Sequence, residues 1–306
     1  MDANLRFWRA EGQSFFQRFL LWADVLDPLL LLKSSDEIRR TRLLLQNSGK
    51  TLSEPIQNDQ VFWSTSSVHP DTDKIIPVLF RPPGNLNPKF IFAYNLSFLQ
   101  FVFHTYTTGF TLFNGNGTVK VEEYPLQQKQ IFYGLGAISY AACIGALPLL
   151  FMNRYTLKSS VTQLVVKKLL PAPLLGLMSA FTVAVVRSPE FENGIEVMDR
   201  NGKVVGVSQK AGEKAVKETA LSRAVLFGTT FFLPALLTYF VERAKFAKTP
   251  RALASVRMFM ITSVLAGMLP VSLSMFPQCG EIKRTDLEPE ILSSTEETEL
   301  FYNRGI

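Results

Sequence analysis

Five long runs of apolar residues alternate with polar segments along the chain, and each run approaches the length of a membrane-spanning helix. A hydrocarbon core of about 30 Å requires about 20 apolar helical residues. The runs predict spans at residues 90–113, 130–151, 169–186, 224–241 and 258–276. We therefore expect an all-α membrane protein with five transmembrane helices, in a domain over residues 90–276.

The segment before the first span, residues 1–89, predicts an amphipathic helical region. Apolar positions recur at helical spacing, and polar positions take the opposite face. The apolar set is Trp8, Phe15, Phe16, Phe19, Trp22, Ala23 and Leu26, and the polar set is Arg9, Gln13, Gln17 and Arg18. Two interpretations stay open: the stripe lies in the headgroup plane of a bilayer, or it packs on the protein's own spans.

The loop between the third and fourth spans, residues 187–223, predicts a small β-hairpin followed by a helix. Residues 195–198 and 203–207 alternate in polarity, and Asp199-Arg200-Asn201-Gly202 between them is typical of a hairpin turn. Residues 209–223 fit a short helix. After the last span, residues 277–306 form an acidic C-terminal tail, in which 293–299 predict a capped turn or a solvated end.

The loops between the spans differ in charge, and the difference predicts an orientation. The loop 152–168 has four Lys or Arg and no acid, and the loop 242–257 has five against one. With five crossings, both loops share the side of the N-terminus, which the positive-inside bias assigns to the side from which insertion occurs. The two ends of the chain are then expected in different compartments.

The composition argues against several classes of function. A net charge of +6 over 306 residues gives no reason to expect a nucleic-acid partner. Two cysteines, Cys143 and Cys279, and two histidines, His69 and His104, are too few and too scattered for a metal site, and no cofactor is expected. Since the sequence lacks a phosphate-binding glycine loop and a hydrolase elbow, we expect no enzyme. The lipid bilayer is the first expected partner.

Polar residues within the spans are candidates for a pathway through the membrane. The first span is the most polar, and Asn95 and His104 carry donors and acceptors that lipid cannot satisfy. His104 is either a satisfied contact between helices or a proton relay. The span prolines are Pro148, Pro171, Pro173, Pro234 and Pro270. They could break helices at a transport site, or reflect the general tolerance of proline in membrane helices, with Pro171 simply beginning a helix.

A short motif, His69-Pro70-Asp71-Thr72, precedes the first span. Taken alone it predicts a turn, in which Pro70 fixes the backbone and Asp71 or Thr72 caps a following turn of helix. A catalytic role would require a nucleophile or a second ligand nearby, and the neighbouring sequence supplies neither.

The same motif, followed by Phe80-Arg81, resembles the hallmark of the sideroflexins, mitochondrial inner-membrane carriers with five spans. Further segments that fit the family are Gly194 to Asp199, Asn201-Gly202, Gly206-Val207-Ser208, Ala215 to Arg223, Phe276-Pro277-Gln278 and Leu287-Glu288-Pro289-Glu290. The resemblance covers essentially the whole chain. It implies the inner mitochondrial membrane, with the N-terminus in the matrix and the C-terminus in the intermembrane space, as the loop charges also indicate.

Sideroflexins that resemble serine carriers have a Trp-Gln-Trp and several asparagines near the exit of the first span. In this chain only Asn114 and Asn116 match that stretch, and the tryptophans are absent. Amides there could bind a zwitterionic amino acid through directed hydrogen bonds. Asn95, His104, Asn114 and Asn116 are therefore the candidate substrate pathway, although the missing residues argue against serine transport.

Arg6-Phe7-Trp8, Gln13-Ser14-Phe15 and the ending 295–302 resemble one paralogue group of the family. This resemblance implies support for the assembly of respiratory complex I, with its assembly intermediates as partners, and a link to mitochondrial iron and iron–sulfur homeostasis. The alternative is a secondary transporter of serine or a related small amino acid. The scarcity of His, Cys and intramembrane carboxylates disfavours transport of iron or a cofactor.

Overall fold

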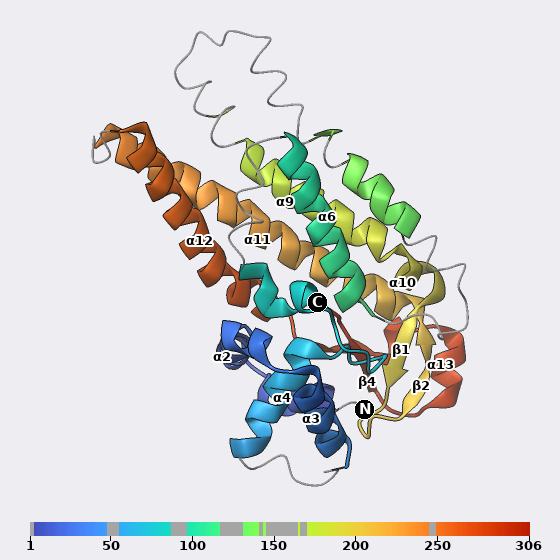
Figure 1. Ribbon diagram of the computed structural model, residues 1–306. Coiled ribbons are helices and arrows are strands. Elements are labelled where there is room, and N and C mark those ends of the chain that lie inside the picture. The colour runs from blue at the N-terminus through green and yellow to red at the C-terminus, as the bar shows by residue number, and fades with distance from the viewer. Residues whose placement is uncertain are drawn as a thin grey trace.

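The computed structural model describes residues 3–47, 55–86, 97–116, 131–140, 143–144, 165, 170–244 and 249–306. Within these ranges the protein is mostly helical, with one small antiparallel sheet. A bundle of long helices forms one part of the molecule. The N-terminal helices and the sheet lie side by side at one end of this bundle (Figure 1).

The bundle confirms the expectation of long apolar helices but not the five spans. Its helices are α6 (Ser97–Asn114), a helix over Ile131–Tyr140, α9 (Pro171–Val186), α11 (Gln209–Arg243) and α12 (Pro250–Ser274). By length and composition α11 and α12 could cross a membrane, and only 28% and 17% of their most apolar windows are buried. The core helix of a soluble protein would be mostly buried. Residues 90–96 of the first predicted span, and 130, 141–142 and 145–151 of the second, lie outside the described residues.

One helix is longer than the sequence predicts. The predicted short helix 209–223 and the fourth span 224–241 form the continuous helix α11, of 35 residues. The charged residues stop at Arg223, which directly precedes Ala224. Neither a glycine nor a proline stands at this boundary, so nothing in the sequence ends the helix there. Pro171 stands at the first turn of α9, so it begins this helix, in agreement with one of the two interpretations of the span prolines.

The N-terminal region is built from short helices. They are α1 (Ala3–Glu11), α2 (Phe15–Val25), η1 (Pro28–Leu32), α3 (Ser35–Asn47), α4 (Pro55–Ser67), η2 (Val78–Phe80) and η3 (Pro82–Leu86). α2 begins with a capping box, in which the side chains of Ser14 and Gln17 each accept a backbone N–H of the other residue. η1 begins where the side chain of Asp27 accepts a hydrogen bond from the backbone N–H of Leu29.

The apolar stripe of α2 is divided between the interior and the surface. Trp22 and Leu26 join a core cluster with residues of α11 and α12, whereas Phe15 and Phe16 are 38% and 77% exposed. Packing on the protein's own helices is thus confirmed for one part of the stripe. Arg18, predicted on the polar face, is instead buried. Its Nε donates to the carbonyl O of Ser274, which lies at the end of α12 and would otherwise lack a helical partner.

The sheet confirms the predicted hairpin and extends it. Its strands are β1 (Ile195–Met198), β2 (Val204–Ser208), β3 (Cys279–Lys283) and β4 (Glu299–Asn303), in the order β2-β1-β4-β3. The helices beside it are α10 (Ser188–Asn193), η6 (Arg284–Asp286) and α13 (Pro289–Ser294). The C-terminal segment, predicted only as an acidic tail, supplies two of the strands. Leu300 and Tyr302 of β4 are fully buried in a core that they share with Ala211 and Ala215 of α11.

The N-terminal region contacts the hairpin and the C-terminal strands directly. The guanidinium group of Arg9 lies 3.8 Å from the ring centroid of Phe301 and donates to the carbonyl O of Arg200 at 2.7 Å. Asn303 Nδ2 donates to Asp71 Oδ1 at 3.1 Å. These contacts place the N-terminal region beside the C-terminal strands, whereas an odd number of crossings would separate the two ends; the orientation of the ends relative to a membrane stays a prediction. An orientation counted loop by loop depends on the number of membrane crossings. One miscounted crossing therefore assigns every later segment to the wrong side of the membrane.

Candidate functional site

The motif His69-Pro70-Asp71-Thr72 forms the predicted turn between α4 and η2. The backbone N–H of His69 donates to the carbonyl O of Lys74 at 3.0 Å, and the carbonyl O of His69 accepts from the backbone N–H of Asp73 at 3.0 Å. Asp73 adopts a positive φ of 53°, a conformation that Asp and Asn tolerate better than most residues. The turn is therefore closed by its own backbone.

The His69 ring joins this turn to the end of α6. Its Nε2 lies 2.5 Å from the carbonyl O of Gly115, and its Nδ1 accepts the backbone N–H of Asp71 at 3.2 Å. An acceptor at Nδ1 fixes the neutral tautomer with the hydrogen on Nε2, which then donates to Gly115. Because Asp71 also accepts from Asn303, the motif connects the N-terminal region, α6 and β4.

The two asparagines of the predicted substrate pathway are hydrogen-bonded to the protein itself. Asn114 Nδ2 donates to the carbonyl O atoms of Phe80 and Phe110, at 2.9 and 2.8 Å. Asn116 Nδ2 donates to Glu190 Oε2 at 3.1 Å and to the carbonyl O of Asn303 at 2.8 Å. Their amide donors are thus engaged in tertiary structure.

A buried ion pair holds α9, α10 and α11 together beside these asparagines. Arg187 Nε and Nη2 donate to Glu190 Oε1 and Oε2 at 2.5 and 2.7 Å, and the two side chains are 2% and 3% exposed. The remaining donors of Arg187 reach Thr219 Oγ1 at 2.8 Å and the carbonyl O of Arg304 at 2.7 Å. A bidentate pair with additional hydrogen bonds compensates the cost of burying two charges.

A second buried arginine follows β4. Arg304 is 1% exposed, and its Nη2 donates to the carbonyl O of Leu273 at 3.0 Å and to Gln278 Oε1 at 3.4 Å. Burial lowers the pKa of Arg304 to about 10. Nearby, the hydroxyl of Tyr302 donates to Glu218 Oε2 at 3.1 Å, and burial followed by the Glu218 charge raises the pKa of Tyr302.

We call this set of neighbouring polar residues the polar junction. Its members are His69, Asp71, Asn114, Asn116, Arg187, Glu190, Asn303 and Arg304. The cavity beside it, lined in part by His69, Asn114 and Gln278, has a volume of about 30 Å³. That volume is about one water molecule and far below the size of ordinary ligand pockets.

Arg223 of α11 lies farther into the bundle, beside α6. Its side chain is 5% exposed, and its Cζ lies 4.6 Å from the ring centroid of Phe110 on α6. No hydrogen-bond partner of its Nη2 is found among the described residues. A buried guanidinium group with an unpaired nitrogen is costly, so this arginine is a candidate for binding an anionic group.

Comparison with known proteins identifies the family. The model of the sideroflexin family matches residues 4–306. The chain belongs to the sideroflexins. Sideroflexin-4 of Danio rerio is 44% identical over the whole of both chains, and Sideroflexin-4 of Homo sapiens is 37% identical over all of this chain and 93% of its own. Sideroflexin-5 of Homo sapiens is 28% identical over 97% of this chain. No solved structure matches.

These relatives confirm the resemblance to the fourth paralogue, and the structure adds residues that the sequence did not single out. Of the predicted pathway, Asn114 and Asn116 lie in the polar junction of this sideroflexin, with the motif residues His69 and Asp71 beside them. His104 is buried on α6, about 15 Å before Asn114 along the helix axis. Asn95 lies outside the described residues.

The sequence does not reveal the buried arginines because they stand at the edges of predicted spans. Arg187 follows the last residue of the third span, and Arg223 precedes the first residue of the fourth. Flanking arginines are ordinarily solvated at the membrane surface. Their position at the same end of two adjacent spans is the one available signal that they could meet.

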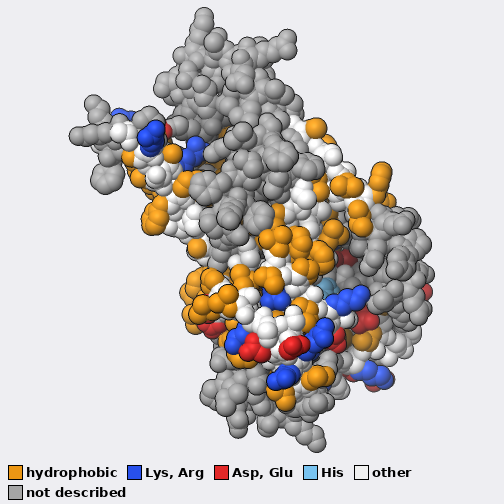
Figure 2. All heavy atoms as spheres, viewed as in Figure 1, with side chains coloured by type: hydrophobic (Ala, Val, Ile, Leu, Met, Phe, Trp, Pro, Cys, Tyr) orange, Lys and Arg blue, Asp and Glu red, His pale blue; other side chains and the backbone are white. Residues whose placement is uncertain are grey.

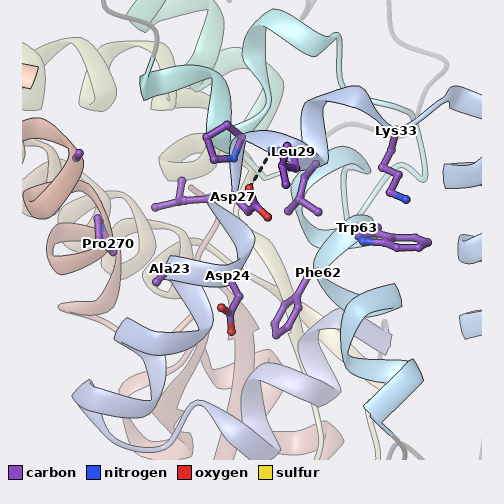
Figure 3. A pocket seen from close by; sticks show the side chains of 12 residues that line it. Ala23, Asp24, Asp27, Leu29, Lys33, Phe62, Trp63 and Pro270 are labelled. Atoms are coloured by element: carbon purple, nitrogen blue, oxygen red, sulfur yellow. Dashed lines mark hydrogen bonds between the residues drawn. The ribbon is translucent and has the colours of Figure 1, made fainter.

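A larger pocket lies outside the bundle core, where the N-terminal region meets α12 (Figure 3). It has a volume of about 740 Å³. We call it the lateral pocket; its lining residues include Asp24, Asp27, Lys33, Phe62, Trp63 and Pro270. Among the described residues, no group of three or more His, Cys, Asp or Glu side chains could hold a metal ion.

Proposed function

We propose that this sideroflexin is a multi-pass protein of the inner mitochondrial membrane that supports the assembly of respiratory complex I. Its link to iron and iron–sulfur homeostasis would then be indirect, through the iron–sulfur enzyme whose assembly it supports. The proposal rests first on similarity to Sideroflexin-4 proteins over the full chain. Two long apolar helices, of whose most apolar windows only 28% and 17% are buried, support the membrane location.

One structural observation favours this function over transport. Asn114 and Asn116 use their amide donors on Phe80, Phe110, Glu190 and Asn303, and the cavity beside Asn114 holds about one water molecule. A carrier must instead offer such groups to its substrate in a cavity of matching size. This use of the amide donors supports a structural role for the two asparagines in the proposed function.

The geometry also supports an orientation for such a scaffold. Arg243 ends α11, and Arg251 and Arg257 lie near the start of α12, at the end of the bundle opposite the sheet (Figure 1). By the positive-inside bias this basic end would face the matrix. The N-terminal region and the sheet would then both face the intermembrane space and present one combined surface to assembly intermediates.

The test is complementation. Cells that lack their own fourth sideroflexin would express either this chain or its variant Glu190→Ala at matched levels, and assembled complex I would be quantified by native gel electrophoresis. We expect the wild-type chain to restore complex I. Failure of an abundant, correctly inserted wild-type chain would contradict the proposal.

Arg223 favours one second candidate, the transport of serine or a related small amino acid. Its Nη2, which has no hydrogen-bond partner among the residues that the structure describes, could bind the substrate carboxylate. Purified protein in liposomes should then accumulate labelled serine, and Arg223→Gln should abolish the uptake. Under the assembly function alone, uptake equals that of empty liposomes, and a serine-carrying sideroflexin serves as the positive control.

A further inference from the structure

Among the described residues of the N-terminal region, the four most exposed large apolar side chains lie on α2 and η1. Phe16 and Leu20 of α2 are 77% and 63% exposed, and Leu29 and Leu32 of η1 are 65% and 80% exposed. Hydrophobic side chains gather on the flank where α2 lies below α12 (Figure 2). We call these four residues the apolar edge. An exposed apolar surface of this kind is typical of contact with a membrane or with another protein.

The exposed side of α2 carries no charge from Gly12 to Ala23. The one charged residue in this stretch, Arg18, is buried and bonded to the end of α12. The exposed polar neighbours of Phe16, namely Gln13, Ser14 and Gln17, are neutral. Such a surface would bind a bilayer by burying apolar area and does not depend on attraction to anionic lipids.

The bond between Arg18 and Ser274 sets the level of α2 along α12. Arg18 Nε donates to the carbonyl O of Ser274 at 3.0 Å, and Ser274 is the last residue of α12. The uncharged stretch of α12 from Met258 to Ser274 is about 26 Å long, close to a hydrocarbon core of about 30 Å. Ser274 then lies near the boundary between acyl chains and headgroups. Phe16 and Leu20, on either side of Arg18 in α2, lie near the same boundary.

η1 reaches further along α12. Leu29 lines the lateral pocket together with Ala266 and Pro270 of α12, and Figure 3 shows Leu29 and Pro270 around the same space. Ala266 and Pro270 stand about 12 and 6 Å before Ser274 along the helix axis. Interfacial helices bury their apolar face about 5–10 Å into the boundary of headgroups and acyl chains. The level of η1 along α12 matches that depth.

We propose that the apolar edge inserts into the interface of the bilayer that α12 spans, in the leaflet at the Ser274 end. The inference rests on the membrane location proposed above. The stripe of α2 then has two partners, since Trp22 packs on the protein's own helices and Phe16 contacts lipid. Lipid is favoured over a second protein, because the end of α12 already places the apolar edge at the membrane boundary.

Spin labels on the full chain, reconstituted in phosphatidylcholine nanodiscs, test this inference. The labels are attached at Phe16→Cys, at Leu32→Cys and, as the control, at Leu43→Cys. Each variant also carries Cys143→Ser, and Cys279 is buried. Leu43 is 58% exposed but lies on α3, farther from the bundle (Figure 1). Oxygen collides with labels in lipid, and a water-soluble nickel chelate collides with labels in water. We expect oxygen to dominate at positions 16 and 32, and nickel at position 43.

A label at Ser263→Cys, an exposed position near the middle of the uncharged stretch of α12, separates the two proposals. Oxygen at position 263 with nickel at positions 16 and 32 would overturn the interfacial insertion alone. Low collision with both reagents at positions 16 and 32 would reveal a protein contact and would overturn it as well. Nickel at position 263 would contradict the span of α12, and with it the membrane location on which the inference rests.

Discussion

The polar junction and the lateral pocket both gather charged side chains beside the bundle, but they use them differently. In the polar junction, Arg187 finds Glu190, Thr219 and the Arg304 carbonyl, all from the protein itself. The adjoining cavity is about 30 Å³, against about 740 Å³ for the lateral pocket, whose lining includes Asp24 and Asp27. Charged residues that look functional in the sequence can therefore be structural, and charged residues that look structural can line a pocket.

The difference follows from the cost of desolvation. A buried charge that loses water requires a partner at fixed geometry, and the polar junction supplies one from segments far apart in the chain. A partly exposed carboxylate keeps its water and can exchange it for a ligand. The polar junction should therefore contribute more to stability than the partly exposed charges that line the lateral pocket.

The largest expected effect concerns the placement of the two chain ends. The polar junction exists only if Asp71 and Asn303 share a compartment. Epitope tags at Met1 and Ile306 should therefore show the same protease protection in mitoplasts, and a tag between Ala244 and Thr249 should show the opposite protection. If the two end tags differ in protease protection, the contacts between the N-terminal region and β4 cannot form. The polar junction then cannot stabilise the fold more than the lateral pocket does.

Removal of one partner of the buried ion pair comes next. Glu190→Ala leaves the guanidinium group of Arg187 buried with fewer partners, at a cost of about 3–5 kcal/mol in the free energy of unfolding. Thermal unfolding in detergent should show a strongly lowered midpoint. Glu196→Ala, at an exposed position of β1, is the control and should leave the midpoint nearly unchanged. Similar midpoints for both variants would show that the polar junction does not stabilise the fold.

Much of this architecture could be predicted from local patterns. The hairpin followed from alternation around Asn201-Gly202, the turn at His69 from Pro70, and the start of α9 from Pro171. These features depend on neighbouring residues, and the sequence displays neighbours directly.

The polar junction could not be predicted, because its members pair across long separations. Asp71 bonds Asn303, and Asn116 bonds Glu190, although no local pattern relates these positions. The strand that contains Leu300 and Tyr302 was obscured by the acidic residues before it. A single sequence shows that Arg187 and Arg223 flank apolar runs, but not whether they face water or each other.

Loss of the motif histidine should have an intermediate effect. His69→Ala removes one hydrogen bond to Gly115 and one from Asp71, and leaves the Gly115 carbonyl buried without that donor, at a cost of about 1–3 kcal/mol. His69→Gln can still donate to Gly115 and should recover part of the loss. Protein abundance in mitochondria and thermal unfolding in detergent both measure the loss of stability and its partial recovery. Normal abundance with lost complementation would instead indicate a binding role for His69.

The smallest expected effect lies at the edge of the same turn. Arg42 Nε donates to Asp73 Oδ1 at 2.7 Å, but the Asp73 side chain is 54% exposed, so solvent screens the pair. Asp73→Asn keeps an acceptor and a residue that tolerates the positive φ, and should cost below about 1 kcal/mol. Asp73→Ala should cost about 1 kcal/mol more, because alanine adds backbone strain at φ 53°. Equal losses in the two variants would show that the charge, and not the backbone conformation, decides the contribution of Asp73. Lys217→Ala, in a pair exposed on both sides, provides the baseline.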